Sequence, residues 1–341
     1  MEAYQSGLET GDLEYATFSM VSYYYSSFIM GRDLAEIEQE IVKNNEVISQ
    51  FQQESSSHIQ DLIQQIIINL RRTRSNPCHF NNEDYDEDKM RQFYLETNNK
   101  NATCTLYLHK FILCYLFQKF PQALENATIG AKYLDAMLGT NTIPLFNFYE
   151  SLTWLAIFPD KNNSEQKRFL KQLKSNQKKL KKWANFTPIN YLHKFYLVEA
   201  ERARVLGKDK DARAYYDKAI DLAQQHEYPN EEALAYELAG RFYLTQGMTQ
   251  LSHFYLSHAI YGYQRWGALA KVKDLETRYP EISVKTTPTS PFIKGSALDL
   301  SSILKASQTM AGEIELGRLL DKLMRIVIEN AGAEKGFLLL P

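Results

Sequence analysis

The sequence predicts an all-α fold, an α-solenoid built from helical hairpins, and three observations support this prediction. Residues 37–65 and 169–183 contain no proline or glycine over many helical turns. Residues 189–222 resemble residues 229–262, and a glycine, Gly207 or Gly247, separates two helical runs in each copy. Glycine ends a helix in the left-handed conformation at little steric cost. Each copy should therefore be a helix-turn-helix, and such hairpins stack because one alone cannot bury its apolar face.

The two copies match at positions where helices pack. The matching pairs are Tyr196 and Tyr236, Tyr215 and Tyr255, Ala219 and Ala259, Ile220 and Ile260, and Ala200 and Gly240. The last pair places a small residue in the first helix of each copy. We therefore expect the second helix to cross the first closely at this point.

Two weaker copies precede this pair. In one, Tyr107 and Cys114 lie in a first helix, and a break at Phe120-Pro121 leads to a second helix that contains Ala123, Ala127 and Gly130. Proline is tolerated in a first helical turn. The other spans Leu13 to Ile41: a tyrosine-rich helix reaches Gly31, Asp33 begins the next helix, and Leu34, Ile37 and Ile41 share one face. Residues 1–280 are thus predicted to form one helical repeat domain.

Composition limits the function classes. A net charge of −2 and a pI near 6.4 provide no global attraction to nucleic acid or to an anionic membrane. Three cysteines without ligand spacing indicate neither a disulfide framework nor a zinc site. The longest apolar run, residues 111–117, is far shorter than a membrane span, and the N-terminus has no signal sequence. A cytoplasmic location is expected.

Catalytic motifs are absent from the sequence. It contains no GxxxxGK[ST] loop, no GxGxxG loop and no His-Arg-Asp run, and Gly207-Lys208 is interpreted as a hairpin turn. Asp84, Asp86 and Asp88 alternate as in an EF-hand, but Lys89 and Leu95 replace the glycine and the glutamate of that loop. The seven histidines are interpreted as ordinary surface or core residues: His58, His79, His109, His193, His226, His253 and His258. We predict no catalytic, cofactor-binding or metal-binding residue, no cofactor and no enzymatic activity for this chain.

Residues 161–182 contain nine basic residues and one acidic residue, Glu165. Phe169, Leu173, Leu180 and Trp183 recur at helical spacing, and Ser164 is the expected N-cap. The pattern predicts an amphipathic helix with a lysine-rich solvent face. A docking face for an acidic partner or nucleic acid is the alternative, although the aromatic residues do not interleave with the lysines as base stacking would require.

The C-terminal part of the sequence changes character. Residues 281–296 are rich in proline, threonine and serine and predict a linker. Residues 297–341 predict two amphipathic helices followed by one apolar strand, Phe337–Leu340. A single strand has no partner to pair with, and natural folds pair or cover such edges. We therefore expect the chain to be a fragment whose last residues begin a further domain.

The motifs quoted above carry two resemblances. The hairpins, with Ala-x-x-Tyr-Tyr-x-x-Ala-Ile at residues 212–220, resemble the tetratricopeptide repeat (TPR), with a longer loop expected at residues 224–231. Residues 298–340 resemble a signalling helix and the start of a GAF domain, as found in cyanobacterial-type signalling proteins. Those proteins join a serine/threonine kinase, an AAA ATPase, a helical repeat, a GAF domain and a histidine kinase. Segments 7–16 and 261–280 resemble the same proteins.

The second resemblance implies a function. This chain would be a non-catalytic regulatory or scaffold segment that relays or docks between an upstream kinase or ATPase and a downstream GAF sensor. Its partners would be other protein domains rather than a membrane or nucleic acid, with dimerisation through the C-terminal signalling helix. The alternative is a free-standing TPR-like adaptor whose C-terminal strand pairs with another chain.

Overall fold

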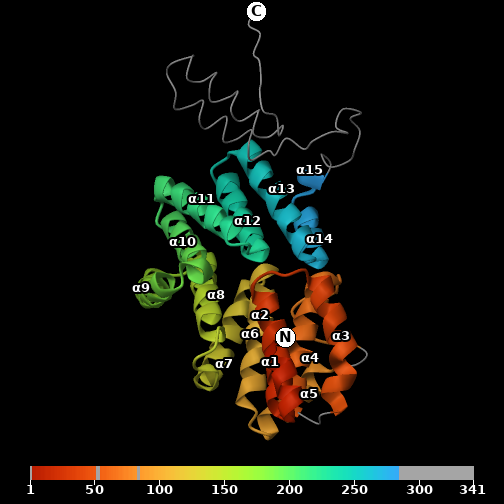
Figure 1. The fold of residues 1–341 in the computed structure, drawn as a ribbon. Coiled ribbons are helices and arrows are strands. Elements are labelled where there is room, and N and C mark those ends of the chain that lie inside the picture. Colours follow the sequence, from red (N-terminus) through yellow and green to blue (C-terminus); the bar gives the residue numbers. More distant parts are fainter. Residues whose placement is uncertain (1, 51–53, 83–84, 284–341) are drawn as a thin grey trace, which may run out of the picture. The chain divides into compact units, whose positions relative to one another are not determined.

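The computed structural model describes residues 2–50, 54–82 and 85–283 (Figure 1). The chain divides into two units, residues 1–283 and 284–341. The predicted linker beyond residue 283, the two tail helices and the strand Phe337–Leu340 lie outside the described residues.

The described part of the first unit is built of helices. The N-terminal helices are α1 (Glu2–Thr10), α2 (Leu13–Ile29), α3 (Leu34–Gln50), α4 (Glu54–Arg71), α5 (Glu87–Glu96), α6 (Lys100–Leu116) and α7 (Phe120–Gly130). Then follow η1 (Ala131–Met137), α8 (Thr142–Ile157), η2 (Phe158–Asp160), α9 (Asn163–Phe186) and α10 (Pro188–Val205). The last are α11 (Asp209–Gln225), α12 (Pro229–Thr245), α13 (Thr249–Trp266), α14 (Leu269–Arg278) and α15 (Pro280–Ser283). No strand occurs among the described residues, which confirms the all-α class.

Helices α10 to α13 form the two predicted hairpins. Gly207 and Gly247 lie in the turns with φ of 68° and 71°. The matched tyrosines contact each other in both copies, with ring centroids 5.9 Å apart for Tyr196 and Tyr215 and for Tyr236 and Tyr255. The close crossing is also confirmed, because a Cβ on Gly240 would lie 2.7 Å from Cγ of Leu256.

Two details of the repeat differ from the sequence prediction. The longer loop expected at residues 224–231 is absent, since α11 ends at Gln225 and α12 begins at Pro229. In the upstream hairpin the break precedes Phe120, which already belongs to α7; Gln118 adopts φ of 58° and Lys119 is the N-cap. Polar residues can adopt positive φ at a helix end, so the turn does not need the proline.

The first hairpin also follows the prediction. Gly31 has φ of 76°, and the Asp33 carboxylate accepts hydrogen bonds from the amides of Ala35 and Glu36 at 2.8 and 3.0 Å. Leu34, Ile37 and Ile41 of α3 are fully buried. The side-chain cap and the buried face together explain why α3 begins where it does.

Contacts between distant hairpins distinguish this unit from a linear solenoid, in which each repeat contacts only its neighbours. Helix α14 packs against α4, and Nζ of Lys271 on α14 donates to the carbonyl of Leu116 at the end of α6, at 2.5 Å. Arg278 donates to the carbonyl of Phe117 at 3.1 Å, and Asn230 donates to the carbonyl of Ile29 at 3.1 Å. These side chains satisfy C-terminal carbonyls that a helix leaves unpaired. The predicted solenoid is therefore not confirmed.

Candidate functional site

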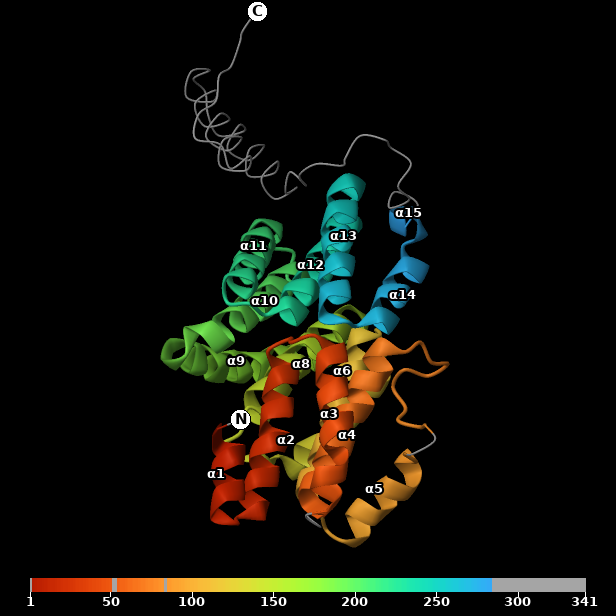
Figure 2. The ribbon, with the colours of Figure 1, turned by 45° about the vertical axis from the view of Figure 1, so that its right-hand side comes forward.

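Helix α9 carries the lysine-rich face that the sequence predicts. It lies at the outer edge of the unit in Figures 1 and 2, packed against α8 and α10. Phe169, Leu173 and Leu180 lie on the opposite face of α9 and are buried. The N-cap is Asn162 rather than Ser164, because Asn162 and Glu165 form a reciprocal capping box. This box also uses the single acidic residue of the segment.

Six exposed lysines form a stripe along α9, which we call the α9 stripe. They recur every three or four residues, apart from the final adjacent pair: Lys167, Lys171, Lys174, Lys178, Lys181 and Lys182. The stripe extends roughly 22 Å at the helical rise per residue. None of the six forms an ion pair with a described residue. The α9 stripe is therefore an uncompensated linear array of positive charge.

A second candidate is a cavity of about 190 Å³ between α2, α8, α10 and the start of α12. Its lining combines apolar, amide and charged side chains: Ser26, Ile29, Met30, Asn141, Leu145, Asn190, Tyr191, Lys194 and Tyr228. No aspartate or glutamate is among them. Asn141 and Tyr228 are the N-caps of α8 and α12, and Asn190 lies in the first turn of α10; the N-caps of these three helices make no side-chain capping bond.

Lys194 is the cation of this cavity. It is 3% exposed, and its ammonium lies 2.6 Å from the Glu231 carboxylate, which also accepts a hydrogen bond from His193. The ammonium donates to the carbonyl of Asn190 at 2.9 Å and lies 4.7 Å from the centre of the Tyr228 ring. A buried lysine is thus held by one carboxylate, one carbonyl and an aromatic face.

The surroundings set the protonation of this group. Burial lowers the pKa of His193, and the neighbouring charge of Lys194 lowers it further. Burial raises the pKa of Glu231, but the attraction of Lys194 and His193 outweighs burial, so its pKa is lowered. Burial also lowers the pKa of Lys194, against the opposing effect of Glu231. At neutral pH the arrangement favours an ionised Glu231 and a neutral His193 that donates from Nε2.

Two tyrosines orient two asparagines at the cavity. Burial raises the pKa of Tyr228 to about 12, and Glu231 contributes to this rise, so the hydroxyl stays protonated. It donates to Oδ1 of Asn190 at 3.0 Å, and the Tyr191 hydroxyl donates to Oδ1 of Asn141 at 3.4 Å. With both oxygens engaged, the amide NH₂ groups of Asn141 and Asn190 have no acceptor among the described residues. The cavity is consequently rich in donors.

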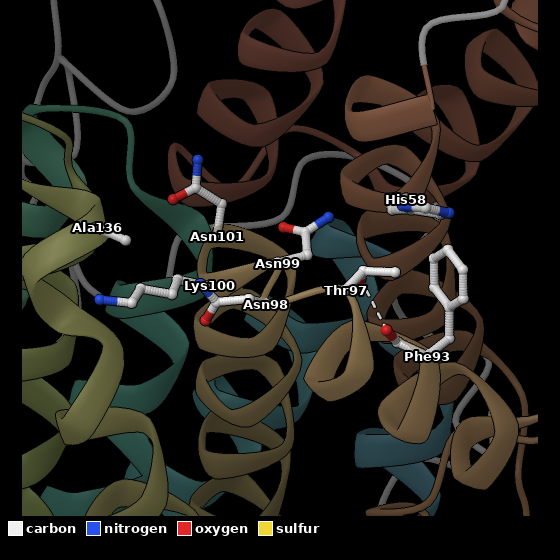
Figure 3. A pocket seen from close by; sticks show the side chains of 8 residues that line it. All are labelled: His58, Phe93, Thr97, Asn98, Asn99, Lys100, Asn101 and Ala136. Carbon is white, nitrogen blue, oxygen red and sulfur yellow. Dashed lines mark hydrogen bonds between the residues drawn. The ribbon is translucent and has the colours of Figure 1, made fainter.

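A larger open hollow of about 540 Å³ lies at the turn between α5 and α6 (Figure 3). Its polar groups already serve the helix ends: the Thr97 hydroxyl donates to the carbonyl of Phe93 at 2.7 Å, and Asn99 caps α6. Lys100 pairs with Asp135 at 3.3 Å, and the His58 ring packs edge-on against Phe93. We assign the hollow a structural role.

Residues weighed in the sequence have ordinary structural roles where they are described. Asp86 caps α5, accepting from the amides of Asp88 and Lys89. His109 is fully buried between Tyr25 and Phe28, and it hydrogen-bonds the carbonyl of Leu62. The three cysteines are free and buried. Within the described ranges, no cluster of histidine, cysteine or carboxylate side chains could hold a metal ion.

Sequence reasoning did not identify His193 and Lys194 as a buried pair.

The described helices include none with the length and hydrophobicity needed to cross a bilayer. This finding concerns only the residues that the structure describes.

Comparisons with known proteins connect the chain to a signalling protein over a short stretch. Hybrid signal transduction histidine kinase G of Dictyostelium discoideum is 57% identical over 44 residues, which is 13% of this chain and 1% of that protein. No family model matches the chain, and no solved structure matches it. The predicted TPR, GAF and cyanobacterial-type relationships therefore stay predictions, and what is established is a local similarity to a histidine kinase.

Proposed function

We propose that this chain is a non-catalytic regulatory segment of a multidomain signal-transduction kinase. The observation that carries this proposal is the 57% identity over 44 residues with a hybrid signal transduction histidine kinase. The matched stretch covers 1% of that protein, so the catalytic activity of the whole relative is not transferred. In this proposal the chain is cytoplasmic and has no enzymatic activity of its own.

The helical unit supports a docking role in such a protein. Its paired hairpins have the small-residue crossings and glycine turns of TPR-like repeats, whose surfaces bind other proteins. The proposed partners are other domains of the same kinase. In this proposal the helical unit is followed in sequence by a dimerising signalling helix and then by the start of a GAF domain. A free-standing TPR-like adaptor is the alternative.

The first test is the size of the native polypeptide in its source cell. An immunoblot with antibodies raised against residues 1–280 should detect a band far above the 39.5 kDa of this chain. Such a band assigns the chain to a larger protein. A band at the size of the chain itself would contradict the kinase context and favour the adaptor.

The second test concerns the α9 stripe, which we infer to be the docking face for an acidic segment of another domain. A fluorescein-labelled glutamate-rich helical peptide should bind the chain, and binding should weaken as salt rises because the charges are exposed. The double variant Lys174→Gln/Lys178→Gln should lower the affinity. The matched control Lys208→Gln/Lys210→Gln removes the same charge from exposed positions around the start of α11 and should leave the affinity unchanged.

A single-stranded oligonucleotide serves as the competing probe in this experiment. Oligonucleotide binding tighter than peptide binding would contradict a protein partner, and equal loss in both double variants would contradict the assignment to α9. The expected outcome is a peptide preference that depends on the α9 lysines.

A further inference from the structure

The cavity bordered by Lys194 is large enough for one small molecule. Its volume is about 190 Å³, whereas an apolar protein cavity of about 150 Å³ accommodates benzene. The side chains of Ile29 and Leu145 and the rings of Tyr191 and Tyr228 supply apolar surface. A nucleotide would need more room, since drug-sized ligands occupy pockets of roughly 300 Å³ or more. The volume therefore selects a ligand of about one ring or a short chain.

The polar groups of the cavity select a negative ligand. Lys194, Ser26 and the amide NH₂ groups of Asn141 and Asn190 are donors, and no carboxylate lines the cavity. A donor-rich and partly apolar cavity matches an organic acid better than a cationic molecule.

Glu231 limits the charge of that ligand. Its carboxylate lies 2.6 Å from the Lys194 ammonium, so part of the positive charge is already balanced. A dianion such as a phosphate ester would be repelled by Glu231 at this short range, whereas a single carboxylate can share the ammonium with it. The arrangement thus favours a monoanion.

We propose that this cavity binds a small monocarboxylic acid, with its carboxylate toward Lys194 and the asparagine amides and its apolar body between Ile29, Leu145 and the two tyrosine rings. The binding site is contained in the helical unit and does not depend on the kinase context. In a regulatory segment it would provide an input for a small-molecule signal.

Fluorine NMR on the full chain tests this proposal with two probes, 4-fluorobenzoate and 4,4,4-trifluorobutanoate. At least one should show saturable shift or broadening at low-millimolar concentration. The uncharged isostere 4-fluorobenzamide should bind about tenfold more weakly than 4-fluorobenzoate, because it lacks the charge-assisted hydrogen bonds. No saturable response from either acid, or equal binding of acid and amide, would overturn the proposal.

Two variants locate the site. Met30 lies at the rim and is 54% exposed, so Met30→Trp should obstruct the cavity without disturbing the core. Leu138→Trp introduces the same side chain at a residue that is 76% exposed and outside the lining. We expect at least about tenfold weaker binding for Met30→Trp and unchanged binding for Leu138→Trp. Equal binding by both variants would refute the location.

A third variant tests the role of the ammonium. Lys194→Gln should remove the preference for the acid over the amide, while a retained preference would contradict the role of Lys194. If that variant does not fold, the acid and amide comparison in the natural chain and the Met30→Trp result still decide the proposal.

Discussion

Two carboxylates on α12, Glu231 and Glu237, have the same burial and different surroundings. Both are 2% exposed and both pair with a lysine, Lys194 or Lys271. Lys271 also donates a hydrogen bond to the carbonyl of Leu116 on α6, and the Tyr263 hydroxyl donates to Glu237 at 2.9 Å. Lys194 instead borders a cavity.

Similar ion pairs can therefore serve different purposes within one helix. Around Glu237 the partners Tyr263 and Lys271 lie on α13 and α14, and Gln118 in the turn after α6 also donates to it, so the group acts as a tertiary connection. Around Glu231 the partner lysine, Lys194, lines a cavity that a ligand or water can occupy. A buried charge next to a cavity is available for binding, while a sealed one contributes to the fold.

The largest expected effect follows from removing the lysine of the sealed group. Lys271→Met leaves Glu237 charged and buried and leaves the Leu116 carbonyl without its partner, so the free energy of unfolding should fall by about 3–5 kcal/mol. Chemical denaturation measures this. Lys273→Met changes an exposed lysine of the same helix and should have little effect; equal losses in both variants would show that Glu237 is not a tertiary connection.

His109 is a buried titratable group without an ionic partner among the described residues, and its contribution to stability depends on pH. Burial lowers the pKa of His109 to about 4, so the unfolded chain takes up this proton first as pH falls below about 6.5. Stability from His109 is therefore present at neutral pH and lost between about 6.5 and 4, by about 3 kcal/mol in total.

The measurement is the difference in unfolding free energy between the natural chain and His109→Phe across this range. Burial raises the pKa of Asp61 to about 6, which has the opposite pH trend, but this contribution is common to both proteins and cancels. A difference that does not change with pH would contradict a neutral, buried His109.

The third effect compares the two carboxylates directly. Glu231→Gln should cost about 1–3 kcal/mol, less than Glu237→Gln, because Lys194 borders the cavity and can gain water when its partner is lost. Denaturation of the two variants side by side measures the order. A larger loss for Glu231→Gln would break the distinction between the sealed and the open group.

The smallest effect concerns lysines that are exposed. The double variant Lys174→Gln/Lys178→Gln should change the unfolding free energy by less than about 0.5 kcal/mol, as expected for surface positions without partners. Thermal melting checks this result. A clear loss of stability would mean that the α9 stripe supports the fold rather than docking.

Local patterns in the sequence predicted the local structure well. The glycine turns, the tyrosine pairs of the two hairpins and the buried face of α9 follow from helical periodicity and from the conformational freedom of glycine. The error at the start of α9 has a local reason as well. Asn162 is followed three residues later by Glu165, the spacing of a capping box that outweighs the single serine chosen instead.

The candidate site and the closure of the repeat could not be predicted in the same way. Lys271 and Leu116 are 155 residues apart, and no periodic pattern relates them. Glu231 and Glu237 belong to α12, a helix of mixed polarity, and charged residues in such a helix normally face solvent. One signal was present, since Glu237 precedes the tightly packed Gly240 by one helical turn.

The capping of α6 by Lys271 and Arg278 has a consequence for synthesis of the chain. The carbonyls of Leu116 and Phe117 leave the ribosome long before their partners, which follow 155 and 161 residues later. At ordinary elongation rates this interval lasts roughly 8–30 s. During that time the end of α6 can bind only water or the wrong donor, so nascent chains should acquire the native protease resistance of α6 only after residue 278 has emerged.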